Sequence, residues 1–200
     1  MIHVIGDSHC IYAFQGIPGA ESHHLGALTM HRLGLPEDNT LRDEVAKINA
    51  GSEDVLLFTA GEIDVRCHVF PQAEKLDGDY MTVIEKLASA FVDKLVTLRP
   101  SGGAQMGVVS VSPPTTRERA HSAPYPVAGS DAQRAYYTRR LNAELMHLCE
   151  WVGMDYLDLY LHYADSNGML RPECSDGNVH IADSAGVRRI LADAWLMEDA

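Results

Sequence analysis

The sequence near the start of the chain, Ile2-His3-Val4-Ile5-Gly6-Asp7-Ser8-His9, is the strongest indication of the architecture. Residues 2–5 are mostly apolar, and residues 6–9 are a glycine followed by three polar residues. This pattern is typical of a short buried strand that ends in a polar turn. Ligands of open α/β sheets bind at the carboxyl ends of the strands, so a serine at position 8 would face a substrate. A polar turn that caps a helix explains the same residues.

Further apolar runs alternate with longer helical patterns, which is the rhythm of βαβ units. We expect strands at residues 2–5, 55–59, 106–111 and 156–160, and a short edge strand at 25–30. We expect helices at 41–50, 79–98, 131–150 and 183–196. Caps are expected for three of them, at Asn39 or Thr40, at Ser130 or Asp131, and at Asp183 or Ser184, and Pro100 is expected to end the second. The sequence therefore predicts one α/β domain over residues 1–200, with three α/β/α layers and a short, mainly parallel sheet.

The segment 112–129 is rich in proline, serine and glycine and predicts a long surface loop without a regular element. Loops of this length in a compact domain are usually functional or mobile. The sequence leaves open whether this one is a lid or a surface excursion.

Charge and cysteine content restrict the classes of partner. The chain of 200 residues has 28 acidic and 16 basic residues, so its formal charge is −12. Without a basic run, such a chain is repelled by nucleic acid and by anionic membranes. The four cysteines have no Cys-x-x-Cys spacing, and the N-terminal residues do not resemble a signal peptide. We therefore expect reduced thiols, a cytoplasmic location and no membrane span, and the oligomeric state stays open.

A second polar motif, Ser175-Asp176-Gly177-Asn178-Val179-His180-Ile181, precedes the last predicted helix. A serine nucleophile needs a base, and the base needs an acceptor that holds its tautomer. His180 and Asp176 could supply these two groups. The alternative is a plain turn with a solvated histidine.

Together the two motifs resemble those of the SGNH (GDSL-type) hydrolase family, whose serine follows the first strand and whose Asp and His share a block near the C-terminus. A third block, Gly61-Glu62-Ile63-Asp64-Val65-Arg66-Cys67-His68, follows the 55–59 strand, where the family places its Gly-x-Asn-Asp block. The resemblance covers the whole chain and implies a flavodoxin-like domain. It implies Ser8 as nucleophile, His180 as base and Asp176 as the residue that orients His180.

The sequence departs from the family pattern at the oxyanion donor. The family's Asn in the third block falls on Ile63, which cannot donate a hydrogen bond, and one lost donor typically costs about 10²–10³ in kcat. Arg66 and His68 are the candidate replacements. Glu62 and Asp64 are expected to orient Arg66 or a sugar hydroxyl, unless Asp64 and Arg66 simply pair with each other.

The second departure is the spacing, because Asp176 lies four residues before His180 where the family has three. A Ser8–His180 dyad with a backbone carbonyl as acceptor therefore stays open. The family's oxyanion glycine best matches Gly26, with Gly34 as the weaker candidate. Asp7 and His9, which flank Ser8, are further candidates for substrate binding.

The sequence favours no cofactor and no metal. Several histidines and cysteines fall near the same strand ends, but none shows the helical spacing of a zinc site; they are His9, Cys10, His23, His24, His31, Cys67 and His68. Four aromatic residues fit either a sugar subsite or core packing: Tyr12, Phe14, Tyr125 and Tyr163.

The expected function is that of a serine esterase acting on an O-acyl ester, with O-acetyl as the expected group, of a small molecule or carbohydrate. Two alternatives are an O-acyltransferase acting on a sugar or polysaccharide and a non-catalytic carbohydrate-binding descendant of the fold. Arg32 and Arg66 near the pocket would leave an anionic sugar acceptable.

Overall fold

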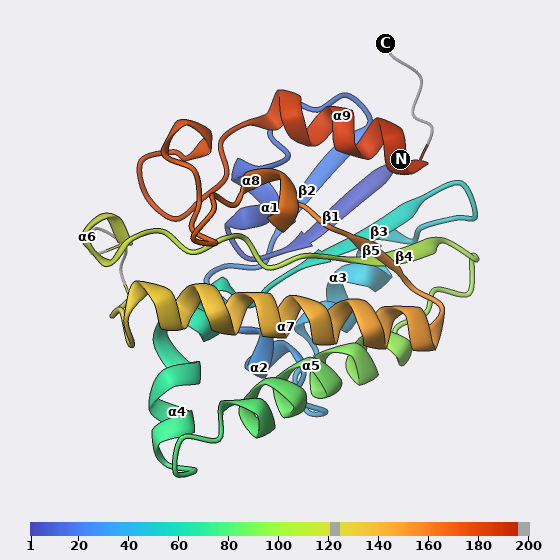
Figure 1. Ribbon diagram of the computed structural model, residues 1–200. Coiled ribbons are helices and arrows are strands. Elements are labelled where there is room, and N and C mark those ends of the chain that lie inside the picture. Colours follow the sequence, from blue (N-terminus) through green and yellow to red (C-terminus); the bar gives the residue numbers. More distant parts are fainter. Residues whose placement is uncertain (121–124, 196–200) are drawn as a thin grey trace.

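The protein is built around a sheet of five parallel strands in the order β2-β1-β3-β4-β5 (Figure 1). The computed structural model describes residues 1–120 and 125–195. The strands are β1 (Ile2–Gly6), β2 (Ala20–His24), β3 (Val55–Thr59), β4 (Gln105–Val109) and β5 (Asp155–Leu157). Helices cover both faces, as an all-parallel sheet requires, so the predicted three-layer α/β/α fold is confirmed.

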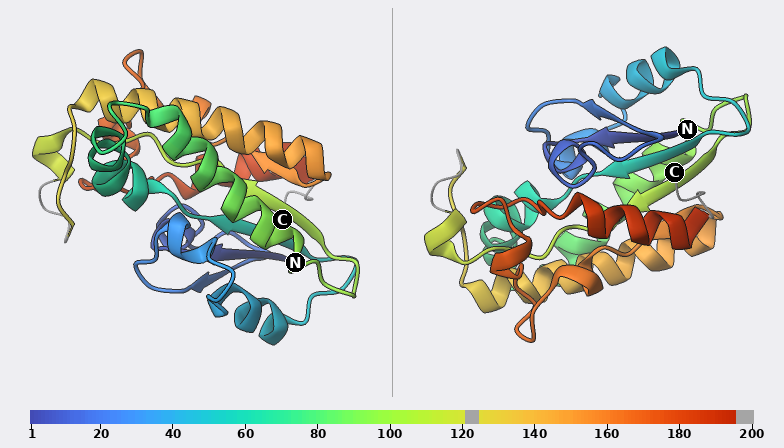
Figure 2. Two further views of the ribbon diagram at one scale, coloured as in Figure 1. Left: turned by 90° about the horizontal axis from the view of Figure 1, so that it is seen from below. Right: turned by 90° about the horizontal axis from the view of Figure 1, so that it is seen from above.

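One face of the sheet is covered by α1 (His9–Tyr12), α8 (Tyr160–Tyr163) and α9 (Ser184–Trp195). The other is covered by α2 (Met30–Leu33), α3 (Thr40–Ile48), α5 (Tyr80–Val96) and α7 (Asp131–Val152). The views from below and above show these two layers in turn (Figure 2). The short elements η1 (Asp64–Val69), α4 (Phe70–Glu74), α6 (Arg117–Ala120) and η2 (Pro172–Cys174) lie in the connections.

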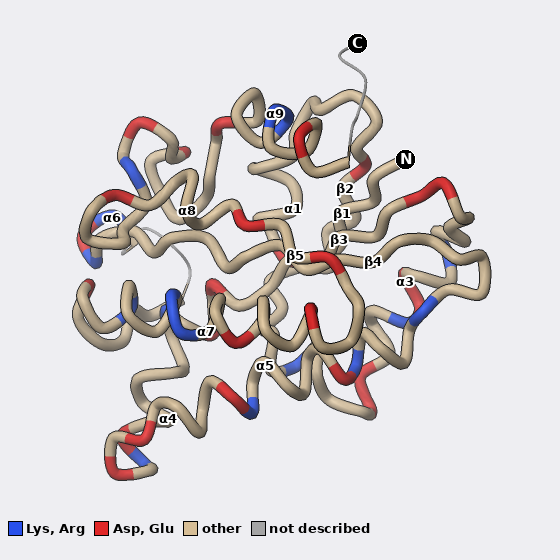
Figure 3. The backbone as a smooth tube through the Cα atoms, turned by 45° about the vertical axis from the view of Figure 1, so that its right-hand side comes forward, with Lys and Arg blue, Asp and Glu red and all other residues tan. Residues whose placement is uncertain are grey.

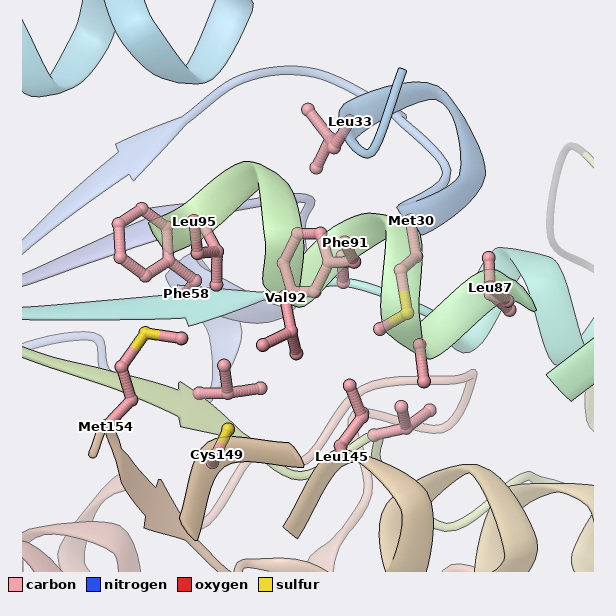
Figure 4. Close-up of a cluster of buried hydrophobic side chains, with 14 of the residues drawn as sticks. Met30, Leu33, Phe58, Leu87, Phe91, Val92, Leu95, Leu145, Cys149 and Met154 are labelled. Carbon is pink, nitrogen blue, oxygen red and sulfur yellow. The ribbon is translucent and has the colours of Figure 1, made fainter. Parts of the chain in front are cut away.

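Alternating strand residues divide the core into two clusters. Val4 and Leu57 pack with α1, α8 and α9, whereas Ile5 and Phe58 pack on the side of α5 and α7. Side chains that alternate across a strand reach opposite faces, so a strand buried on both sides reads as a continuous apolar run. Phe58, completely buried in the larger cluster (Figure 4), is worth about 1.5–3 kcal/mol of burial by itself.

Helix caps confirm where the two long helices begin. The Asp79 side chain accepts a hydrogen bond from the Thr82 N–H at the start of α5. At the start of α7, Ser130 and Gln133 form a capping box, in which each side chain accepts from the other residue's N–H. The predicted helix at 41–50 is α3, with Asn39 at its N-cap position.

Several predicted boundaries were wrong. The edge strand is β2 at Ala20–His24, not residues 25–30, and the last strand stops at Leu157 because Tyr160 begins α8. The segment 112–129 contains α6, and its residues 121–124 lie outside the described residues, as does Leu196, the predicted end of the last helix. The apolar run 25–30 instead leads into α2, which begins at Met30.

Acidic and basic residues are interspersed over the described elements (Figure 3). None of the helices in the described part of the chain combines the length and apolar character needed to cross a lipid bilayer.

Candidate active site

Ser8 lies at the carboxyl end of β1, immediately before α1. The turn passes very close to β3, because a Cβ on Gly6 would lie 1.9 Å from the carbonyl oxygen of Thr59. Only glycine fits this approach. The Ser8 side chain therefore lies at the carboxyl ends of the strands, where ligands of such folds bind.

Ser8, His180 and Asp176 form a continuous hydrogen-bonded relay. Ser8 Oγ lies 2.8 Å from His180 Nε2, and His180 Nδ1 lies 2.6 Å from Asp176 Oδ2. These are the contacts that a nucleophile, a base and an orienting carboxylate make in an acyl-transferring triad. The acceptor on Nδ1 is the carboxylate, rather than the backbone carbonyl that a dyad would use.

The turn that carries Asp176 accommodates the longer spacing. Gly177 has a φ of +88°, a left-handed conformation that favours glycine. Asp176 Oδ1 accepts from the N–H groups of Asn178 and His180 at 2.8 and 3.2 Å, and the Asp176 N–H donates to the His180 carbonyl. With the longer spacing, the Asp176 carboxylate still contacts the imidazole of His180.

The surroundings set the charge of the relay. Burial and the neighbouring His9 lower the pKa of His180, against the opposing effect of Asp176. Although burial acts in the other direction, hydrogen bonds from His180 and Asn178 lower the pKa of Asp176. A neutral imidazole beside an ionised carboxylate is the state that a general base requires.

Tyr12 lies flat against the catalytic candidate His180. The two rings stack with centroids 4.0 Å apart and 10° between their planes, and Tyr12 is 42% exposed. Its position four residues after Ser8, one helical turn along, is the sequence signal that could have indicated this contact. Of the other aromatic candidates, Phe14 and Tyr163 are buried in the core.

Asp7 and His9, the two candidates that flank Ser8, form a hydrogen-bonded pair next to His180. Both are buried; Asp7 Oδ1 accepts from His9 Nδ1 at 3.1 Å, while His9 Nε2 faces the Val179 carbonyl at 3.3 Å. An imidazole that donates to both of these oxygens carries a proton on each nitrogen and is a cation. Burial opposes this charge, but Asp7 outweighs it and the pKa of His9 rises to about 9.

Glu62 and Arg66 form a buried ion pair in the third block. Arg66 Nε lies 2.9 Å from Glu62 Oε1, and Nη2 donates to Oε2 at 3.0 Å. The Arg66 guanidinium also lies 5.7 Å from the ring centre of Tyr125, in the 112–129 loop. The positive charge of Arg66 is neutralised by the Glu62 carboxylate. Arg32 is likewise paired, with Asp38 at 3.1 Å.

The other third-block candidates have separate surroundings. Asp64 is buried and accepts from the N–H groups of Met30 and His31 at 2.6 and 3.2 Å, so it holds the first turn of α2 and does not pair with Arg66. Burial raises the pKa of Asp64 to about 7, against the effect of those two N–H groups. His68 is exposed and Ile63 is buried.

Two backbone N–H groups are free to bind an oxyanion. The Leu25 N–H donates to the Gly6 carbonyl at 2.8 Å, which brings Gly26 beside the turn that carries Ser8. Within residues 1–120 and 125–195, the N–H groups of Ser8 and Gly26 donate to no acceptor. Gly34, the weaker candidate, packs against α5, where an added Cβ would lie 3.0 Å from Ala90.

Comparisons with known proteins identify the fold but no close relative. No protein-family model matches the chain, and no curated protein matches it. A GDSL-like lipase from Bacteroides thetaiotaomicron superposes with a TM-score of 0.63 at 14% identity, over 96% of this chain and 86% of that one. A phospholipase A1 from Streptomyces albidoflavus gives 0.58 at 11% identity, over 96% and 98% of the two chains.

A carbohydrate acetylesterase from Sinorhizobium meliloti gives a TM-score of 0.56 at 12% identity, over 98% of this chain and 99% of that one. In all three superpositions the match covers at least 96% of this chain and at least 86% of the neighbour. The chain therefore has the α/β/α fold of the SGNH (GDSL-type) hydrolases.

Proposed function

We propose that the protein is a serine esterase of the SGNH family. The observation that carries the proposal is the relay Ser8–His180–Asp176, with its contacts of 2.8 and 2.6 Å. His180 Nε2 takes the proton of Ser8 Oγ as the oxygen attacks the ester carbonyl. The protonated imidazole then gives that proton to the departing alkoxide, while Asp176 stabilises the imidazolium.

Water completes the cycle. It enters in place of the alcohol, loses a proton to His180 Nε2 and attacks the acyl group on Ser8. Collapse of this second tetrahedral intermediate breaks the ester to Ser8, whose oxygen recovers the proton from His180, and the acid leaves. The same steps with a sugar hydroxyl in place of water would make an acyltransferase.

The oxyanion of each intermediate would bind to the N–H groups of Ser8 and Gly26. Backbone donors suit this role because they are held in place before the charge develops. Arg66, engaged with Glu62, is not assigned as a donor here. With two donors rather than three, we expect modest turnover.

An acetyl ester of a carbohydrate is the substrate we propose. Two of the proteins that share the fold are described as a carbohydrate acetylesterase and an acetyl xylan esterase, which supports a small acyl group. The exposed ring of Tyr12 beside His180 supports a sugar, because aromatic faces suit the apolar faces of sugar rings.

A serine-directed phosphonate tests the nucleophile. Intact-mass spectrometry should show one adduct on the wild type and on Ser52→Ala, an exposed serine in a turn, and none on Ser8→Ala. The Ser8→Ala change should also lower hydrolysis of p-nitrophenyl acetate by at least about 10⁴-fold. An adduct on Ser8→Ala, or an unreactive wild type, would overturn the proposal.

Product analysis with acetylated sugars tests the substrate and the acceptor. Free acetate in the presence of an unacetylated sugar is the expected product. An acetyl group recovered on that sugar would instead assign the chain to the acyltransferases.

A further inference from the structure

A cluster of side chains of the types that bind metal ions lies on β1 and the outermost strand β2, away from the relay. His3 of β1 and His23 of β2 place Nδ1 and Nε2, respectively, 3.0 Å apart, and Glu21 Oε2 lies 3.8 Å from His3 Nδ1. All three atoms lie within 4.8 Å of one another. The strand register brings them together, because His3 is directly opposite Glu21 and His23 is opposite Ile5 on the same face.

The geometry points to a zinc site formed by His3 Nδ1, His23 Nε2 and Glu21 Oε2, with water as the fourth ligand. Ligands of tetrahedral Zn²⁺ at normal bond lengths are about 3.3–3.5 Å apart. Two of the three separations are 3.0 and 3.8 Å and the third is below 4.8 Å, so a movement of the exposed Glu21 side chain would complete the site. The ligand set of two imidazoles and one carboxylate is one that zinc uses when it keeps an open position.

Glu44, from α3, contacts the ring nitrogen of His23 that does not face the proposed ion. Its Oε1 lies 3.1 Å from His23 Nδ1. A carboxylate that accepts from the distal nitrogen fixes the tautomer, so the lone pair of Nε2 points toward the proposed ion. Without zinc, His3 Nδ1 donates to this lone pair. On binding, the His3 proton moves to its own Nε2, and both imidazoles stay neutral.

Burial and charge around the cluster also favour a cation. The side chains of His3 and His23 are 11% and 13% exposed, whereas Glu21 is 59% exposed. Solvent therefore reaches the open position while the imidazoles stay held by the fold.

Such an ion would tie the edge strand to its neighbours. β2 is bonded on one side only, to β1, and α3 reaches it through Glu44. The views of Figure 2 show α3, in light blue, beside the blue strands at this edge. About 10 Å of strand separates His3 from Gly6, so the ion would act on stability and not on the ester carbonyl. This inference is independent of the proposed function.

Calorimetric titration of the protein, freed of any histidine tag, with Zn²⁺ at pH 7.5 tests the site. We expect one ion per chain, and a rise in the thermal midpoint of about 5 °C at a free zinc concentration 100-fold above Kd. Glu21→Gln and His23→Gln should each weaken binding by at least about 10-fold, and Glu44→Gln by about 10-fold. His24→Gln, an exposed histidine on the same strand, should leave Kd unchanged.

Co²⁺ gives a second readout, since tetrahedral coordination produces strong visible absorption that should be lost in His23→Gln. Glu21→Gln replaces an exposed side chain, so its folding is not in question. Absence of zinc binding would overturn the proposal. Binding that survives His23→Gln but is lost in His180→Gln would also overturn it, because the ion would then belong to the catalytic relay.

Discussion

The imidazole of His9 lies against that of His180, with ring centroids 4.9 Å apart. His9 is held as a cation by Asp7 Oδ1 on one nitrogen and by the Val179 carbonyl on the other. A buried positive charge therefore lies next to the proposed general base. It disfavours a second positive charge on His180 and keeps that imidazole ready to accept a proton.

The first prediction concerns the acid limb of the pH–rate profile. The limb of kcat/KM for p-nitrophenyl acetate should have its midpoint below 6.5, because burial and His9 lower the pKa of His180. In His9→Gln the cation is gone, so the midpoint should move to higher pH. His24→Gln should leave it in place. If the midpoint in His9→Gln is unchanged or lies at lower pH, the charge of His9 does not lower the pKa of His180.

Stability should fall on the alkaline side for the same reason. The pKa of His9 is raised from 6.5 to about 9 in the folded protein. The folded state therefore binds the proton more tightly, and the stabilisation is complete below pH 6.5 and is lost as pH rises through 9. It amounts to about 3 kcal/mol. Urea unfolding across this range should show wild type and His9→Gln converging; parallel profiles would contradict the assignment.

Asp176→Asn tests whether the longer spacing still yields a working triad. With the carboxylate 2.6 Å from Nδ1, we expect kcat/KM to fall by about 10³- to 10⁴-fold, because an amide favours the wrong tautomer of His180. Asp158→Asn is the matched control, because this carboxylate likewise accepts from a backbone N–H, that of Leu161 in α8. A loss below 10-fold would mean that His180 works without Asp176.

The Glu62–Arg66 pair predicts a non-additive effect on stability. Both side chains are about 95% buried, so Arg66→Met alone leaves an uncompensated carboxylate and should cost about 3–5 kcal/mol. Adding Glu62→Leu should recover most of this loss. Urea unfolding of the two single variants and the double variant gives the coupling energy directly. Additive losses would show that the two groups do not act as a pair.

Ile63→Asn asks whether a third oxyanion donor improves turnover. Ile63 is buried, and among the described residues it belongs to neither of the two clusters that cover the faces of the sheet. An amide at this position should raise kcat by about 10-fold or more, with KM little changed. Ile63→Leu is the control. A folded Ile63→Asn variant with unchanged or lower kcat would place residue 63 away from the oxyanion.

Strands were predicted best where both of their faces are buried. The 55–59 run matches β3, and the start of α7 was predicted at Ser130 or Asp131, of which Ser130 is the N-cap. Apolar runs and cap residues are local signals. β2 escaped prediction because its sequence, Ala-Glu-Ser-His-His, is polar: an edge strand need not be buried on both faces. The run 25–30 was taken for the edge strand because apolar residues also anchor the turn into α2.

Local sequence was enough to predict that a serine follows a buried strand and that a histidine and an aspartate precede the last helix. The pairings between side chains could be seen only in the folded chain. Glu62, not Asp64, binds Arg66; Asp7 and His9 pair next to His180; and His3 meets His23 and Glu21 across two strands. The physical reason is that side-chain partners depend on strand register and helix docking. Those are set by the packing of the whole core, which no single stretch of the chain specifies.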